Sequence, residues 1–264
     1  MFIMRVLLLP VATLSAVLLV WAAGLMPESG KSGDTAARVP VLVELFTSEG
    51  CSSCPPADAF LQKLDRQPVA GADIIVLSEH VDYWNHIGWE DPYSARFYSD
   101  RQTSYAKRFD LEGPYTPQMV VDGSSEFVGS DQELARKSLD KALEVRKIPV
   151  RLSAISIGPG NTLHGHVETG TIPDDAEVVV AVALNRAESH VLRGENGGRT
   201  LTHIAVVRTM TKIGTATRGQ AFARDLQIKL EPRLTPDNLR VVAFIQEVHQ
   251  GKILGSTVEM VPGN

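Results

Sequence analysis

Apolar runs alternate with amphipathic stretches in the first part of the chain. Residues 41–46 form a nearly continuous apolar run, the pattern of a strand covered on both faces, and residues 72–80 form a second. Between these runs, residues 57–64 carry apolar side chains at the spacing of one helix face. This part of the chain is therefore expected to form a strand, a helix and another buried strand.

The next elements complete a recognisable order. Residues 92–109 have a helical pattern, and Asp122-Gly123 is a strong hairpin signal between strands expected at 118–122 and 126–128. Ser130 and Glu133 have capping-box spacing before a helix expected to run to about residue 145. The order strand, helix, strand, helix, strand, strand, helix is that of thioredoxin, and it ends where Pro149 breaks the helical pattern.

The second half has a different texture. Short strand-like runs are separated by clusters of Gly, Pro, Asn and Asp, which is typical of a β-sandwich. We therefore predict an α/β thioredoxin-like domain at residues 39–148, followed by an all-β sandwich-like domain at 149–264. The expected strands of the second part are 151–157, 162–168, 177–184, 202–208, 222–230, 239–248 and 252–260.

The N-terminal residues have the features of an export signal. Arg5 gives a positive start, residues 6–20 are apolar, and Ala22-Ala23-Gly24 suits signal peptidase. We predict a signal peptide at residues 1–26, with an uncleaved membrane anchor as the alternative, and a polar linker at 27–38. The protein is thus expected to be exported, periplasmic or secreted, and to touch a membrane only if this segment stays uncleaved.

Composition narrows the function classes. The chain is 44% hydrophobic and 22% charged, as in soluble globular proteins, and its net charge is -5. No basic stripe with interleaved aromatic residues is present, so the sequence argues against a nucleic-acid partner.

Cys51 and Cys54 are the chain's only cysteines and stand at C-x-x-C spacing after the first strand. Export allows a disulfide to persist, and a helix N-terminus favours thiolate. The sequence favours a redox-active pair, with Cys51 more exposed and attacking and Cys54 resolving, and predicts no other cofactor. A structural disulfide and a zinc site remain alternatives, although so short a loop adds little stability and zinc needs four ligands.

Two further positions are candidate catalytic residues. Glu44 is an acid inside an apolar strand, and its place resembles the buried aspartate that assists proton transfer in thioredoxins. A structural ion pair with Lys or Arg is the alternative role for Glu44. Thr116-Pro117, just before a strand, looks like the thioredoxin-fold loop whose proline is cis and faces the disulfide.

Several motifs together resemble one family. Residues 44–58, 80–84, 101–102, 115–123 and 194–201 are similar to the exported, poorly characterised family catalogued as domain of unknown function 1223. The resemblance spans roughly the whole mature chain. It implies a thioredoxin-like domain and supplies no established substrate.

Other polar and aromatic residues suggest binding roles. Thr116, Tyr83, Trp84 and Arg199 are candidate substrate contacts, with plain core packing or turn formation as the alternative. The glycine-rich loop at residues 194–199 is expected to lie near the loop at 83–89 and to narrow access to Cys51.

The predicted function is that of a thiol–disulfide oxidoreductase acting on protein or small-molecule thiols and disulfides. One alternative is copper binding or delivery, with His80 and His86 as candidate ligands beside the cysteines. Another is a non-catalytic binding module.

Overall fold

The computed structural model describes residues 1–2 and 38–263. The predicted signal peptide and linker therefore lie almost entirely outside the described residues. Within the described ranges, no helix has the length and apolar character needed to cross a membrane.

The predicted elements are present with small shifts at most ends, but the strands expected at 177–184 and 202–208 are much longer and extend to His190 and Ala216. Helix α2 begins at Arg96 instead of residue 92, and Asp131, not Ser130, caps α3 by accepting hydrogen bonds from the N–H groups of Glu133 and Leu134. The helices are α1 (Pro55–Arg66), α2 (Arg96–Arg108) and α3 (Gln132–Leu143), with short 3₁₀ turns η1 (Asn85–Ile87) and η2 (Pro236–Asn238). The strands are β1 (Val39–Thr47), β2 (Ala72–His80), β3 (Gln118–Val121), β4 (Ser125–Val128), β5 (Val150–Gly158), β6 (Thr162–Thr169), β7 (Ala176–His190), β8 (Thr200–Ala216), β9 (Ala223–Lys229), β10 (Leu239–Glu247) and β11 (Ile253–Met260).

One sheet runs through both predicted domains. Strand β1 pairs with β2 in parallel and with β3 in antiparallel orientation, and β3 and β4 form the expected hairpin. The other edge of β2 pairs in parallel with β8, where Ser78 lies opposite Val206. From there the sheet continues, giving the order β11-β10-β7-β8-β2-β1-β3-β4.

The predicted fold class is therefore wrong. The protein is mostly β, built on a mixed eight-stranded sheet, and is not an α/β thioredoxin fold followed by a separate sandwich. Strands β7, β8, β10 and β11 extend the first sheet, and only β5, β6 and β9 form a sheet of their own. The apolar pattern identified the strands because it is local, but pairing between distant strands leaves no comparable local signal.

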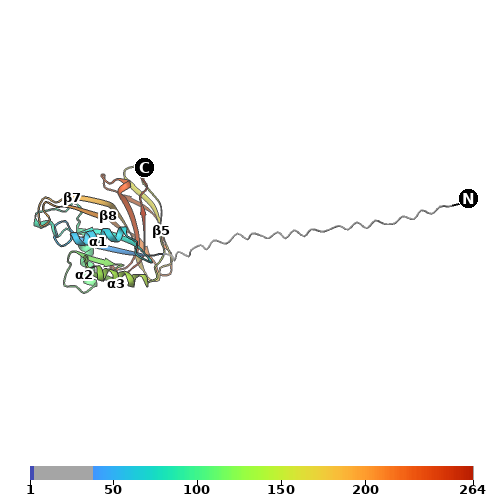
Figure 1. Cartoon of the computed structure of the whole chain (residues 1–264), viewed down its shortest axis with the longest axis horizontal. Coiled ribbons are helices and arrows are strands. Elements are labelled where there is room, and N and C mark those ends of the chain that lie inside the picture. Colours follow the sequence, from blue (N-terminus) through green and yellow to red (C-terminus); the bar gives the residue numbers. More distant parts are fainter. Residues whose placement is uncertain (3–37, 264) are drawn as a thin grey trace. The chain divides into compact units, whose positions relative to one another are not determined.

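The two faces of the large sheet have different covers. Apolar residues of α1 and α3 pack on alternate positions of β1, including Val41, Val43 and Leu45. The small sheet covers the corresponding positions of β7 and β10. Helix α2 covers the other face, where Tyr98 packs in one cluster with Leu42 of β1 and Phe244 of β10. Figure 1 shows α1 beside the long hairpin of β7 and β8.

Candidate functional site

The candidate site lies where β1 ends and α1 begins. Cys51 and Cys54 form a disulfide, with their Cα atoms 5.4 Å apart. A tight turn carries them: the Cys51 N–H donates to the Ser48 carbonyl, and the Cys54 N–H to the Cys51 carbonyl, both at 3.2 Å. Pro55 and Pro56 then open α1, where the missing N–H groups need no helical partner.

Both cysteines are completely buried. The expectation that Cys51 is more exposed than Cys54 is wrong, because each has an exposed fraction of 0% in the disulfide form. A chain segment more than 140 residues away covers the turn, and local sequence gives no sign of that cover.

This cover is the loop at residues 194–199, which joins β7 to β8. Asn196, itself fully buried, donates from Nδ2 to the carbonyls of Glu49 at 2.8 Å and Cys51 at 2.9 Å. The Glu195 carboxylate accepts from the Ser52 N–H at 2.9 Å, and hydrogen bonding to the side chain and then the backbone of Ser52 lowers the pKa of Glu195. The predicted placement of the loop over the cysteine turn is therefore confirmed.

Glycines shape that loop. Gly194 and Gly198 have φ of 77° and 82°, in the left-handed region that glycine occupies without steric cost. A Cβ at Gly194 would come within 3.4 Å of Trp89, so the 194–199 loop also packs on the predicted aromatic loop. Arg199 acts within its own loop, donating to Asn196 Oδ1 at 2.7 Å.

The aromatic loop closes another side of the site. Trp84 Nε1 donates to Thr116 Oγ1 at 2.7 Å, so two of the candidate substrate contacts bind each other. Tyr83 donates to Gln102 Oε1 at 3.0 Å, and burial raises the pKa of Tyr83 to about 12. A Cβ at Gly50 would approach Trp84 Cβ to 3.0 Å, which places this loop directly against the residue before Cys51.

The peptide bond between Thr116 and Pro117 is cis, as predicted. Gly129 lies between Pro117 and the first turn of α1, since a Cβ there would come within 3.3 Å of Pro117 and 3.1 Å of Ala57. The contact of Pro117 with the sulfur atoms stays a prediction.

Glu44 takes part in a buried polar network on the α2 side of the sheet. Arg101 Nε donates to Glu44 Oε1 at 2.7 Å, and the Tyr105 hydroxyl donates to Oε2 at 2.6 Å. Of the two roles considered, the structure shows the ion pair; the proton-transfer role of Glu44 stays a prediction. Arg101 therefore faces two buried acids, Glu44 and Glu79. Burial, and then the neighbouring Glu44, raise the pKa of Glu79 well above its usual value.

The two candidate metal ligands have separate partners. His80 is fully buried, and its Nδ1 lies 2.7 Å from Asp91 Oδ2. His86 is exposed on η1, with Nδ1 2.6 Å from the Tyr83 carbonyl. In the part of the chain that the structure describes, no group of three or more His, Cys, Asp or Glu side chains could hold a metal ion.

Comparison with known proteins identifies the family. The family model described as "Protein of unknown function (DUF1223)" matches residues 42–246, most of the chain. The chain belongs to the DUF1223 family. No curated protein sequence matches it significantly.

Two solved structures share the DUF1223 chain's fold. The protein AGR_C_4864 from Agrobacterium tumefaciens is 24% identical with a TM-score of 0.68, covering 86% of this chain and 96% of that one. HBP35 of Porphyromonas gingivalis is 16% identical with a TM-score of 0.62, covering 85% of this chain and 76% of that one. At these identities the likeness concerns the fold alone.

Sequence reasoning missed a cluster of buried ionisable side chains in this DUF1223 protein. The cluster lies at the same end of the large sheet as the cysteine turn. His203 of β8 lies between Glu49, which precedes the cysteines, and Asp58 of α1. The signal for His203 was the one that singled out Glu44, an ionisable residue in an apolar run. Asp58 stands one helical turn after Cys54, a spacing that also could have been read from the sequence.

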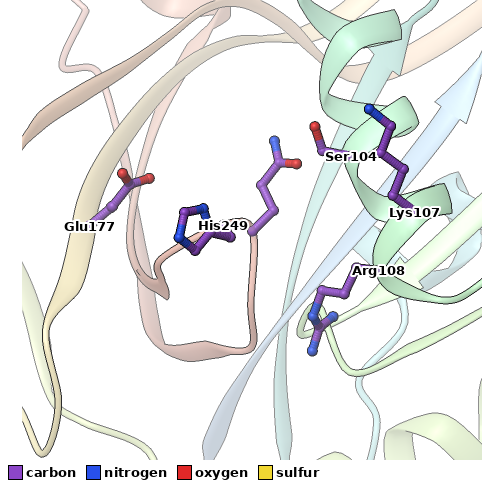
Figure 2. A pocket seen from close by; sticks show the side chains of 6 residues that line it. Ser104, Lys107, Arg108, Glu177 and His249 are labelled. Atoms are coloured by element: carbon purple, nitrogen blue, oxygen red, sulfur yellow. The ribbon is translucent and has the colours of Figure 1, made fainter.

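The cavity of about 620 Å³ in Figure 2 lies at the other end of the sheet. Ser104, Lys107 and Arg108 of α2 line one side, facing His249 and Glu177. Arg108 donates to the carbonyl of Gly123, in the turn that follows β3 far from the cysteines. This cavity is therefore separate from the disulfide.

Proposed function

We propose that the protein is a thiol–disulfide oxidoreductase whose redox pair is Cys51 and Cys54. The observation that carries the proposal is the disulfide between the chain's only two cysteines, three residues apart at the start of a helix. A helix N-terminus stabilises the thiolate that appears when such a bond is reduced. The closed loop is very short, so the chain-entropy contribution of the bond is about 2 kcal/mol, at the low end of the usual range for disulfides.

The chemistry is thiol–disulfide exchange. A substrate thiolate attacks Cys51 Sγ, forming a mixed disulfide while the Cys51–Cys54 bond breaks, and Cys54 Sγ leaves with the electron pair and takes up a proton. A second substrate thiol then attacks the substrate sulfur and releases Cys51. The substrate pair is oxidised by two electrons to a disulfide, and the protein becomes the dithiol; the reverse steps transfer a disulfide to the protein.

Burial gives the proposed enzyme a gate. Because both sulfur atoms are inaccessible, exchange requires the 194–199 loop to leave the turn at Ser52. The contacts of that loop with Glu49 and Cys51 would then decide which thiols and disulfides reach the pair, small molecules passing more easily than protein chains.

We also propose that the protein works after export. The support is the N-terminal pattern of an export signal, in which Arg5 precedes an apolar segment and a site of small residues. An exported location suits a disulfide-forming pair. N-terminal sequencing of the protein recovered from a cell envelope fraction tests this part separately; a start at Met1 in cytosolic protein contradicts it.

The redox proposal is tested by equilibrating the protein with glutathione mixtures of defined ratio and counting free thiols after acid quenching. We expect a two-electron transition within the range of known redox proteins. A Cys54→Ser variant should accumulate a mixed disulfide at Cys51 when incubated with oxidised glutathione. A pair that stays fully oxidised in all mixtures, even after the loop contact is removed by Asn196→Ala, overturns the proposal.

A further inference from the structure

Several buried polar atoms beside the disulfide have no hydrogen-bond partner. Buried polar groups are nearly always paired, so each exception needs a reason. Within the described residues, four such atoms belong to one cluster: Glu49 Oε1, His80 Nε2, and both ring nitrogens of His203. His203 is 1% exposed, with Nε2 3.4 Å from Glu49 Oε1 and Nδ1 3.7 Å from Asp58 Oδ2.

The two carboxylates flank the cysteines in the chain. Glu49 is two residues before Cys51, and its other oxygen accepts from Trp89 Nε1 at 2.7 Å. The Asp58 N–H donates to the Cys54 carbonyl at 3.1 Å, so these residues are one helical turn apart. Side chains on a helix lean toward its N-terminus, and Asp58 therefore leans back toward the cysteine turn. His203, from β8, thus lies between groups on both sides of the redox pair.

His203 carries a positive charge at neutral pH. Burial lowers the pKa of a histidine, but Asp58 and Glu49 outweigh burial here and raise the pKa of His203 to about 10. The other groups facing it are the edge of His80, with ring centroids 4.7 Å apart, and Tyr93 at 6.1 Å. His80 is itself held by Asp91, so the cluster brings together the His203 ring and the carboxylates of Glu49 and Asp58 next to the cysteine turn.

We propose that His203 is a positioning residue of the redox pair, holding Glu49 and Asp58 in place and offsetting their charge when a thiolate forms on reduction. The proposal rests on the proposed function. A positive charge beside a cysteine stabilises its thiolate, and a carboxylate destabilises it. His203 and the two carboxylates are therefore expected to shift the thiol pKa in opposite directions.

The test titrates the thiols of the reduced protein by the ultraviolet absorbance of thiolate. We expect His203→Gln to raise the lower thiol pKa and Asp58→Asn to lower it, each by roughly half a unit to one and a half units, the size of a single charge within about 10 Å at an intermediate dielectric. His203→Lys, which keeps a positive charge, should restore the value toward wild type.

The matched control is Asp122→Asn, which breaks the buried ion pair with Lys147 at the opposite end of β3 and should leave the thiol pKa unchanged. If Asp58→Asn and His203→Gln shift the thiol pKa in the same direction, or no more than the control does, the proposal is overturned. If His203→Gln does not fold, Asp58→Asn and Glu49→Gln must both lower the thiol pKa; no shift in either overturns it. Because the titration needs no substrate, it stands apart from failure of the exchange assay.

Discussion

Asn196→Ala should speed reduction of the disulfide. Both sulfur atoms are buried, so a small thiol reacts only with molecules whose 194–199 loop has opened. Asn196 holds that loop to the cysteine turn by two hydrogen bonds from Nδ2, to Glu49 and to Cys51. Its third bond, from Arg199, lies within the loop and survives opening.

The magnitude follows from those two bonds. A hydrogen bond contributes about 0.5–1.5 kcal/mol net, so losing two lowers the free energy of opening by about 1–3 kcal/mol. Where opening is a rapid pre-equilibrium, the rate of reduction rises by the same factor as the open population. At about 1.4 kcal/mol for each tenfold change, this is an increase of roughly 5- to 150-fold.

The assay follows loss of the disulfide in dithiothreitol by alkylation and mass spectrometry. Asn238→Ala is a matched control. The Asn238 side chain also makes two hydrogen bonds with backbone groups, the N–H and the carbonyl of Arg186, and these lie outside the cysteine turn. Its reduction rate should equal that of wild type. Equal rates for Asn196→Ala and wild type would refute the gating argument, and equal acceleration by the control would show general loosening instead.

Three further results are expected. Cys51→Ala should abolish thiol exchange but lower the melting temperature by only about 4–8 °C, since closing so short a loop contributes about 2 kcal/mol; a large drop with exchange retained would indicate a structural bond. The pKa of His203 is raised from 6.5 to about 10, so its protonation adds to the free energy of unfolding. This contribution is complete below pH 6.5 and is lost as the pH rises through 10. Thermal melts should therefore show a steeper loss of stability from pH 7 to 10 in wild type than in His203→Gln, and parallel curves would count against an imidazolium. Residues 39–148 expressed alone should be insoluble or unfolded by circular dichroism, because the edge of β2 and apolar side chains such as Leu77 lose their cover; a soluble fragment with a cooperative melt would contradict this.

The sequence predicted local features well. Helix and strand periods located every strand of the sheets, and the C-x-x-C spacing located the disulfide, because each depends on residues close together in the chain. The cis bond before Pro117 was predicted because the loop at Thr116-Pro117 resembles the loop of thioredoxin folds whose proline is cis.

Non-local features were not predictable in the same way. Strand β2 pairs with β8, where Ser78 lies opposite Val206, and the sequence of neither strand indicates which strand it pairs with. The burial of Cys51 depends on Asn196, which reaches it from a distant hairpin, so a local view left the cysteine exposed. His203 was read as part of an ordinary strand because its carboxylate neighbours come from other elements.

The hairpin of β7 and β8 contributes to the candidate site in two ways. Its loop at residues 194–199 covers the cysteine turn, and its strand β8 supplies His203. His203 lies in the paired portion, opposite Ala187 of β7, and the pairing with β2 at Val206 follows three residues later. The loop tip at Asn196 is held to the cysteine turn mainly by side-chain bonds, which break without disturbing the strand ladder. Opening the tip can therefore expose the sulfur atoms while His203 stays between its carboxylates. Access to the disulfide and the pKa of the thiols can therefore be changed separately. A change at Asn196 alters how often the 194–199 loop opens and exposes the sulfur atoms, whereas a change at His203 alters the thiol pKa.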